Sequence, residues 1–211
     1  MSLEAITEAI INLEEREVLK LVKESLDANE DPIKVLEACR KGMAKIGNES
    51  GEGGTIFLTD LIMAGEIFNE AMEILMPKLT VSTTKNLGKV VIGTVQGDIH
   101  NIGKDITINF LKAEGFEVID LGVDVPPEKF VDAIKEHNPP VVGMSGLLTL
   151  SIEPMRRSVE AIKNANLRDK VKVIIGGERT DEEVCKHVGA DAWVNDAIEG
   201  VKIIKNWVGG A

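Results

Sequence analysis

The second half of the sequence alternates between short apolar runs and segments of helical periodicity, and this alternation limits the possible folds more than any other feature. Five runs rich in β-branched residues are each followed by a helical pattern. Runs that are apolar throughout are typical of parallel strands with helices on both faces. Such repeats predict a doubly wound, five-stranded parallel sheet. The predicted strands are 90–95, 117–121, 141–145, 171–175 and 192–194, and the predicted helices are 104–114, 127–137, 154–165, 181–188 and 197–207.

The first half shows helical periodicity throughout. Apolar residues recur at steps of three and four, which gives each segment one apolar face. Asp31-Pro32 suits a helix start, and Pro77 suits a helix end. The helical patterns cover residues 3–13, 14–26, 31–46 and 59–75. Three glycines separate the third pattern from the fourth: Gly51, Gly53 and Gly54.

These two halves predict two domains joined by a polar connection. We assign residues 1–78 to a four-helix bundle, 79–89 to a turn-rich linker and 90–211 to an α/β domain. For five strands, the flavodoxin-like (Rossmann-like) order 2-1-3-4-5 is expected by analogy with other doubly wound sheets.

The composition argues against nucleic acid and membrane partners. Aromatic residues make up 3% of the chain, Tyr is absent, and the net charge is −11. Such a chain lacks the basic surface and the aromatic stacking platform that nucleic acids require. No apolar run approaches the length that spans a bilayer. The two isolated cysteines, Cys39 and Cys185, suit a reducing compartment, so we expect a cytoplasmic protein.

The unusual residues of the second half follow three strands. Open parallel sheets bind ligands beyond the carboxyl ends of their strands, where the strand order reverses. The connections after the first, third and fourth predicted strands would meet there, offering small residues, hydroxyl groups and one imidazole to a single crevice. Their sequences are Gly97-Asp98-Ile99-His100-Asn101-Ile102-Gly103, Ser145-Gly146-Leu147-Leu148-Thr149-Leu150-Ser151 and Gly176-Gly177.

His100 and Asp98 suggest chemistry most strongly. A carboxylate beside an imidazole can accept its Nδ1 proton, fix its tautomer and raise the basicity of Nε2, which makes a metal ligand or a general base. Plainer explanations exist, since His100 could be a surface residue and Asp98 could cap the next helix. Ser151 could cap the helix entered at Pro154, Ser145 could satisfy backbone groups, and the glycines could form turns.

Other chemistries lack necessary parts. A hydrolase of this fold needs a GxSxG elbow, and a dinucleotide site needs GxGxxG; the sequence has neither. A zinc site needs three or four protein ligands, and two of the three histidines lie in predicted helices elsewhere. One imidazole suffices for a metal already held by a macrocycle. The pattern therefore favours a metal cofactor that brings its own equatorial ligands.

The spacing of these residues resembles a known signature. Asp98-x-His100-x-x-Gly103, then 41 residues, Ser145-x-Leu147, then 28 residues and Gly176-Gly177 resembles the cobalamin-binding motif of methionine synthase and its relatives. The helical half, with its run from Gly54 to Leu61, resembles their cap domain. The whole chain is similar to the free-standing corrinoid proteins of methylamine, methanol and related methyltransferase systems.

The resemblance implies a role for each motif residue. His100 would replace the dimethylbenzimidazole of the cofactor as the lower axial ligand of cobalt. Asp98 would hold its other nitrogen, and Ser151 would bond to Asp98. Ser145 would bond to the benzimidazole nitrogen, and Gly176-Gly177 would leave room for the nucleotide tail.

The same resemblance implies further contacts with the cofactor. Three residues of the cap would shield the methyl face, although the two leucines serve equally well as bundle core: Phe57, Leu58 and Leu61. The remaining contacts would come from the loops of the α/β domain: Gly97, Ile99, Asn101, Ile102, Gly103, Leu147 and Thr149.

A methyl-carrier function follows from the resemblance. The cofactor would be cobalamin, alternating between a Co(I) corrinoid and methylcobalamin. The partners would be a substrate-specific corrinoid methyltransferase, a second methyltransferase serving tetrahydrofolate, coenzyme M or a similar acceptor, and a reductive activase. We expect no turnover by this chain alone.

Three alternatives remain open. A mutase subunit would share the histidine loop, but a four-helix cap is not its usual arrangement. A cobalamin sensor needs an output module, which we do not expect here. A flavodoxin-like domain could also bind another ligand.

Overall fold

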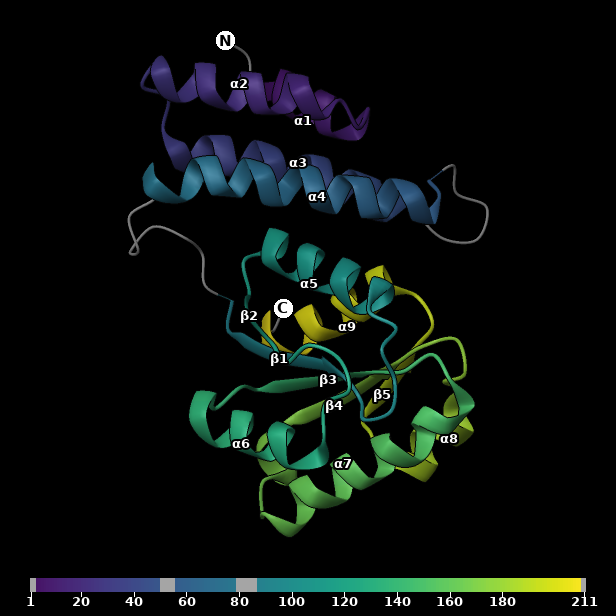
Figure 1. Ribbon diagram of the computed structural model, residues 1–211. Coiled ribbons are helices and arrows are strands. Elements are labelled where there is room, and N and C mark those ends of the chain that lie inside the picture. Colours follow the sequence, from purple (N-terminus) through teal and green to yellow (C-terminus); the bar gives the residue numbers. More distant parts are fainter. Residues whose placement is uncertain (1–2, 50–55, 79–86, 210–211) are drawn as a thin grey trace. The chain divides into compact units, whose positions relative to one another are not determined.

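The computed structural model describes residues 3–49, 56–78 and 87–209 (Figure 1). By internal contacts the chain divides into two compact units, residues 1–86 with 113–115, and residues 87–112 with 116–211. The glycines between the third and fourth helical patterns, and most of the predicted linker, lie outside the described residues.

The first unit is helical. Its elements are α1 (Leu3–Ile11), α2 (Glu15–Asp27), α3 (Pro32–Glu49), α4 (Leu58–Leu75) and the 3₁₀ turn η1 (Met76–Lys78). The Asp31 carboxylate accepts the N–H of Ile33 at 3.0 Å and so caps α3, whose first residue is Pro32. At the start of α4, the Asp60 carboxylate accepts the N–H of Phe57 at 2.8 Å. The predicted helical first half is confirmed.

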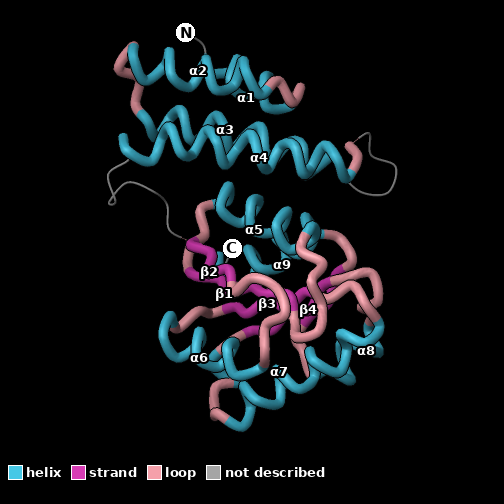
Figure 2. The backbone as a smooth tube through the Cα atoms, viewed as in Figure 1, coloured by secondary structure: helices cyan, strands magenta, loops and turns pink. Residues whose placement is uncertain are grey.

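The second unit is a five-stranded, all-parallel sheet with helices on both faces. The strands are β1 (Lys89–Thr94), β2 (Glu117–Asp120), β3 (Val141–Ser145), β4 (Lys172–Gly176) and β5 (Ala192–Val194), in the order β2-β1-β3-β4-β5. Helices α5 (Ile102–Glu114) and α9 (Ala197–Gly209) cover one face, and α6 (Pro127–His137), α7 (Ile152–Asn164) and α8 (Glu182–Val188) cover the other (Figures 1 and 2). Two 3₁₀ turns complete it, η2 (Thr149–Ser151) and η3 (Arg168–Lys170). The predicted fold class and strand order are confirmed.

Two helices begin earlier than the sequence predicts. Helix α7 begins at Ile152 rather than at Pro154. A proline in the first turn is tolerated because the N–H groups of that turn have no partner within the helix. Helix α5 begins at Ile102, so Gly103 lies in its first turn and not in a loop.

The register of the sheet aligns the ends of three strands. Thr94 of β1 lies opposite Ser145 of β3, and Ser145 lies opposite Gly176 of β4. The loops after these strands therefore leave the sheet at the same edge. On the α6 and α7 side, the apolar core includes Phe130, Met144 and Met155, each at most 2% exposed.

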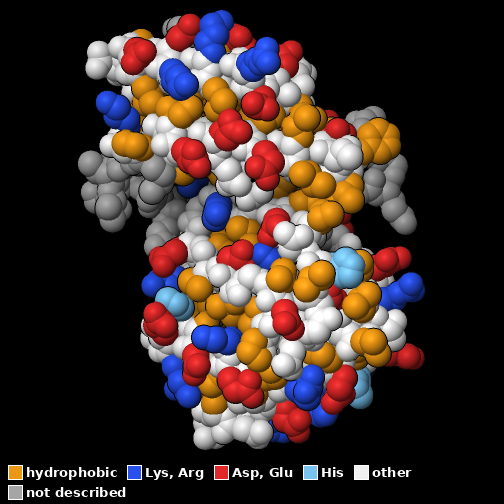
Figure 3. Space-filling model, viewed as in Figure 1, with side chains coloured by type: hydrophobic (Ala, Val, Ile, Leu, Met, Phe, Trp, Pro, Cys, Tyr) orange, Lys and Arg blue, Asp and Glu red, His pale blue; other side chains and the backbone are white. Residues whose placement is uncertain are grey.

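Charged side chains are spread over the surface. Acidic and basic groups are interspersed on the face drawn in Figure 3. Within the described ranges, no helix combines the length and the apolar composition needed to cross a bilayer.

Candidate functional site

Asp98 is a buried carboxylate at the shared edge of the sheet. It is 1% exposed and lies in the loop between β1 and α5. Its Oδ1 accepts the backbone N–H of His100 at 2.9 Å and lies 2.7 Å from the Nδ1 of the same residue. Its Oδ2 accepts the Ser151 hydroxyl at 2.6 Å and the N–H groups of Leu147 at 2.8 Å and Leu148 at 3.2 Å. One carboxylate therefore joins the β1–α5 and β3–α7 connections.

The environment keeps Asp98 ionised. Burial alone would raise its pKa, but the hydrogen bonds from Ser151, His100 and Leu148 outweigh burial and hold the pKa of Asp98 well below its usual range. An ionised carboxylate can only accept hydrogen bonds.

The charge of Asp98 determines the tautomer of His100. Because Oδ1 must accept, the imidazole proton lies on Nδ1, and Nε2 carries the free lone pair. The His100 side chain is 48% exposed. The pair therefore presents one basic nitrogen, at a fixed ring orientation, to a ligand outside the protein.

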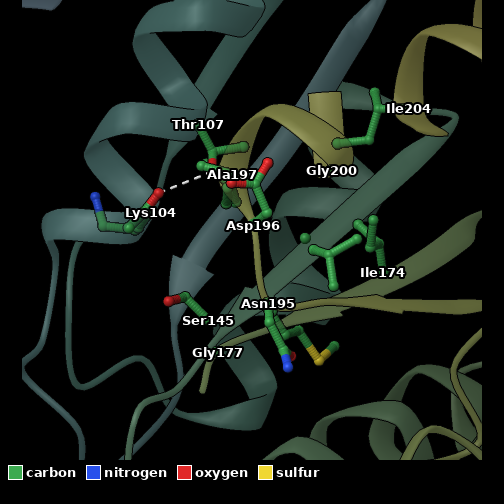
Figure 4. A pocket seen from close by; sticks show the side chains of 16 residues that line it. Lys104, Thr107, Ser145, Ile174, Gly177, Asn195, Asp196, Ala197, Gly200 and Ile204 are labelled. Atoms are coloured by element: carbon green, nitrogen blue, oxygen red, sulfur yellow. Dashed lines mark hydrogen bonds between the residues drawn. The ribbon is translucent and has the colours of Figure 1, made fainter. Parts of the chain in front are cut away.

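A cavity opens at the same edge of the sheet, between the strands and the helices α5 and α9 (Figure 4). It contains about 560 Å³ of empty space, part of which is open to solvent. Thr107 contributes from α5, Ile204 from α9, and Ile174 and Ser145 from the strands. Glycines line much of it: Gly103, Gly143, Gly176, Gly177 and Gly200.

Ser145 is the free hydroxyl of this cavity. Among the described residues it has no hydrogen-bond partner for its side chain, whereas the Thr107 hydroxyl donates to the Gly103 carbonyl at 2.8 Å. An uncommitted hydroxyl in a largely apolar cavity can donate a hydrogen bond to one acceptor atom of a mainly apolar ligand.

The adjacent glycines at the end of β4 are required for different reasons. A Cβ on Gly177 would lie 1.9 Å from the carbonyl oxygen of Gly146, and the Gly177 φ angle is +148°, so the protein itself requires glycine there. A Cβ on Gly176 would meet only Val194, at an ordinary 3.6 Å. The absence of a side chain at Gly176 therefore enlarges the cavity and is not demanded by the backbone.

Exposed apolar side chains lie on the two loops that Asp98 joins. Ile99 is 72% exposed, Ile102 53% and Leu150 82%, and Leu147 is partly exposed. Such a cluster at a sheet edge is typical of a binding surface. Thr149 begins the turn η2, and Ser151 ends it. Asn101, which directly precedes α5, donates its side-chain amide to the Asp105 carboxylate of that helix at 2.7 Å.

The three candidate residues of the helical unit differ in exposure. Phe57 and Leu58 are exposed at the start of α4, whereas Leu61 is 7% exposed and belongs to the buried face of that helix. Their role at a cofactor stays a prediction.

Several residues at the site carry no recognisable sequence signal. Gly143 and Gly200 line the cavity from β3 and α9. Lys104 is buried, and its ammonium group donates to Asp105 at 2.6 Å and to both oxygens of Asp120 at 2.9 Å, which ties the first turn of α5 to the end of β2. A glycine inside the apolar run 141–145 was the one available hint, because strand glycines often mark the close approach of a ligand.

Comparison with known proteins identifies the families to which the two halves of the chain belong. Residues 88–202 match a family described as B12 binding domain, and residues 2–76 match a second family of the same description. The chain is 37% identical to trimethylamine corrinoid protein 1 of Methanosarcina acetivorans, over 94% of this chain and 93% of that protein. It is 35% identical to a corrinoid protein of Desulfitobacterium hafniense, over 98% and 97%.

Two solved structures share the fold over nearly the whole chain. A cobalamin-binding protein from Desulfitobacterium hafniense is 42% identical, with 98% of both chains covered and a TM-score of 0.77. A chain of the methanol:cobalamin methyltransferase complex from Methanosarcina barkeri is 26% identical, with 98% of this chain and 79% of that chain covered and a TM-score of 0.84.

The two glycines predict opposite results for the stability of the cofactor-free protein. We expect Gly177→Ala to lower the free energy of unfolding by about 2–4 kcal/mol, from overpacking and backbone strain. Gly176→Ala should change it by less than about 1 kcal/mol. Both tryptophans, Trp193 and Trp207, lie in the α/β unit, so urea unfolding followed by tryptophan fluorescence reports on this unit. Equal losses in the two variants would contradict the distinction.

The lowered pKa of Asp98 predicts an acid-dependent part of the stability. The unfolded chain takes up the proton near the ordinary pKa of about 3.9, while the folded chain resists protonation to lower pH. This contribution is complete above that pH and is lost as the pH falls below it. Asp98→Asn should therefore lower the free energy of unfolding at pH 7 by about 2–3 kcal/mol. It should also flatten the acid branch, which is the decrease in the free energy of unfolding as the pH falls below about 4. Asp132→Asn removes an exposed charge on α6 and serves as the control; an unchanged acid branch in Asp98→Asn would refute the assignment.

Proposed function

Because the chain belongs to the B12-binding corrinoid protein family, we propose that it carries a methyl group on the cobalt of a bound corrinoid from one methyltransferase to another. The observation that carries this proposal is the Asp98–His100 pair together with a glycine-lined cavity at the same edge of the sheet. The names of its relatives, corrinoid proteins of trimethylamine and dimethylamine, support the same function.

The residues of the site fit a corrinoid whose own base has left the metal. His100 Nε2 would bind cobalt from below, in place of that base. The cavity would receive the nucleotide tail, and the Ser145 hydroxyl would donate to the free nitrogen of its base. The exposed apolar cluster of Ile99, Ile102 and Leu150 would lie against the ring.

The chemistry of accepting and releasing a methyl group would be supplied by the bound corrinoid. The protein residues around His100 would determine how readily its Nε2 binds the metal. Asp98 keeps the proton on Nδ1 and makes Nε2 a better donor to the metal. The Ser151 hydroxyl, 2.6 Å from Asp98, completes a chain of hydrogen bonds along which a proton can be held when His100 binds or leaves.

Partner proteins would supply the remaining steps. A substrate-specific methyltransferase would activate the donor, and a second methyltransferase would pass the methyl group to tetrahydrofolate, coenzyme M or a similar acceptor. A reductive activase would restore the reduced cofactor. We place the system in the cytoplasm, where the buried free thiols of Cys39 and Cys185 suit a reducing environment.

The carrier is favoured over a mutase subunit or a sensor. Both units of the chain match B12-binding families, and corrinoid proteins align with nearly its entire length.

Because the partner enzyme is proposed to activate the methyl donor, we predict that donors with good and poor leaving groups react differently with the isolated carrier. The cofactor-loaded, reduced protein should be methylated by iodomethane without help, because iodide is a good leaving group. Methylated amines or methyl ethers should react only after the cognate methyltransferase is added, since the described residues form no acid–base pocket for activating them. Absorption spectra during single-turnover mixing measure the methylation.

Gly177→Ala is not a suitable control, because we expect this substitution to destabilise the fold. Boiled methyltransferase added to the wild-type protein is the better control. Sustained demethylation of an amine by the isolated chain would overturn the proposal.

A further inference from the structure

The connection after β2 runs alongside the loop that carries His100 and is hydrogen-bonded to it. At the ends of β1 and β2, the backbone N–H of Thr94 donates to the Gly122 carbonyl at 2.9 Å. The Thr94 carbonyl accepts the backbone N–H of Val125, also at 2.9 Å. Val95 and Val125 then form a parallel bridge. The two connections therefore run side by side past the strands, toward Gly97 and Asp98.

One residue continues this pairing where the ladder ends. The backbone N–H of Asp124 donates to the carbonyl of Asp98 at 2.9 Å. The carboxylate of Asp124 accepts the backbone N–H of Gly97 at 2.7 Å. The contact is exposed to solvent, which screens the charge of Asp124, so the presence of an oxygen acceptor at this distance matters more than its charge.

The backbone of Asp124 is adapted to this double contact. Its φ angle is +53°, in the left-handed region that only glycine, asparagine and aspartate adopt readily. Glycine would accept the conformation but lose the carboxylate. Asparagine would accept the conformation and keep an oxygen acceptor.

Asp98 is thus held from two directions. The β3–α7 connection holds its side chain through Ser151, Leu147 and Leu148. The β2–α6 connection holds its main chain, and that of Gly97, through Asp124. Since His100 takes its orientation from Asp98, any shift of residues 97–98 would move the imidazole.

We propose that Asp124 is a positioning residue that fixes the height and angle of His100 at the cobalt, acting through the backbone of Gly97 and Asp98. The effect on cobalt rests on the function proposed above, whereas the effect on the backbone does not. Loss of the carboxylate would loosen the loop, so that His100 leaves the metal more readily while the cavity still holds the cofactor.

The test compares Asp124→Gly with Asp124→Asn. Glu128→Gln, which removes an exposed charge from α6, is the matched control. The first measurement uses the cofactor-free protein and follows the hydrogen exchange of the Gly97 amide. We expect exchange about tenfold faster in Asp124→Gly, the change that corresponds to one lost hydrogen bond. Asp124→Asn and Glu128→Gln should stay within about twofold of wild type.

The second measurement uses the cobalamin-loaded protein in the Co(II) state. The EPR spectrum gives the ratio of molecules with and without an axial protein nitrogen. We expect the share without this ligand to rise about fivefold in Asp124→Gly, with the amount of bound cofactor unchanged, and to stay near wild type in Asp124→Asn.

The possible failures are distinguishable. If wild type itself shows no axial protein nitrogen, the proposed function fails. If wild type shows it but Asp124→Gly keeps wild-type exchange at Gly97 or a wild-type EPR ratio, the positioning role fails. An Asp124→Asn protein as impaired as Asp124→Gly would also overturn the role of the accepted hydrogen bond.

Discussion

The buried carboxylate of Asp98 is the interaction on which the rest of the site depends. An ionised group with 1% exposure is tolerated only when its oxygens are satisfied. Here the donors come from His100 itself and from Leu147, Leu148 and Ser151 on the β3–α7 connection. The need to satisfy one charge therefore brings two loops together, and the same charge fixes the tautomer of the imidazole. The hydrogen bonds that stabilise the buried charge of Asp98 thus both connect the loops and orient His100.

The sheet supplies the second condition, which is an open cavity at the same edge as that imidazole. Parallel register ends β1, β3 and β4 at one level, and glycines at these ends and on α9 leave room between the sheet and two helices. These glycines are not equivalent. Gly177 is required by the close approach of the Gly146 carbonyl, while Gly176 leaves a volume that the cofactor-free protein does not need. A residue that leaves such a volume is better evidence for a ligand than one that the backbone demands.

Much of this could be predicted from the sequence, for identifiable reasons. Apolar β-branched runs marked the strands, and the order of five strands follows from the common doubly wound arrangement. The motif around Asp98 and His100 was visible because its chemistry needs particular residue types at fixed spacing. Asp124 and Lys104 were not visible, since their partners lie on another connection and only the folded chain brings them together. The early start of α7 was missed because a proline three residues into a helix resembles a helix boundary.

The central claim is that the His100 imidazole, held by Asp98, is the lower ligand of cobalt. The most direct measurement is the EPR spectrum of the Co(II) form, recorded on protein whose histidines alone carry ¹⁵N and on unlabelled protein, each loaded with unlabelled cobalamin. The account predicts that the nitrogen superhyperfine triplets of the unlabelled protein become doublets on labelling, and that His100→Ala lacks this coupling. Triplets that persist after labelling would show that the cofactor's own benzimidazole remains bound to the metal, and would contradict the account.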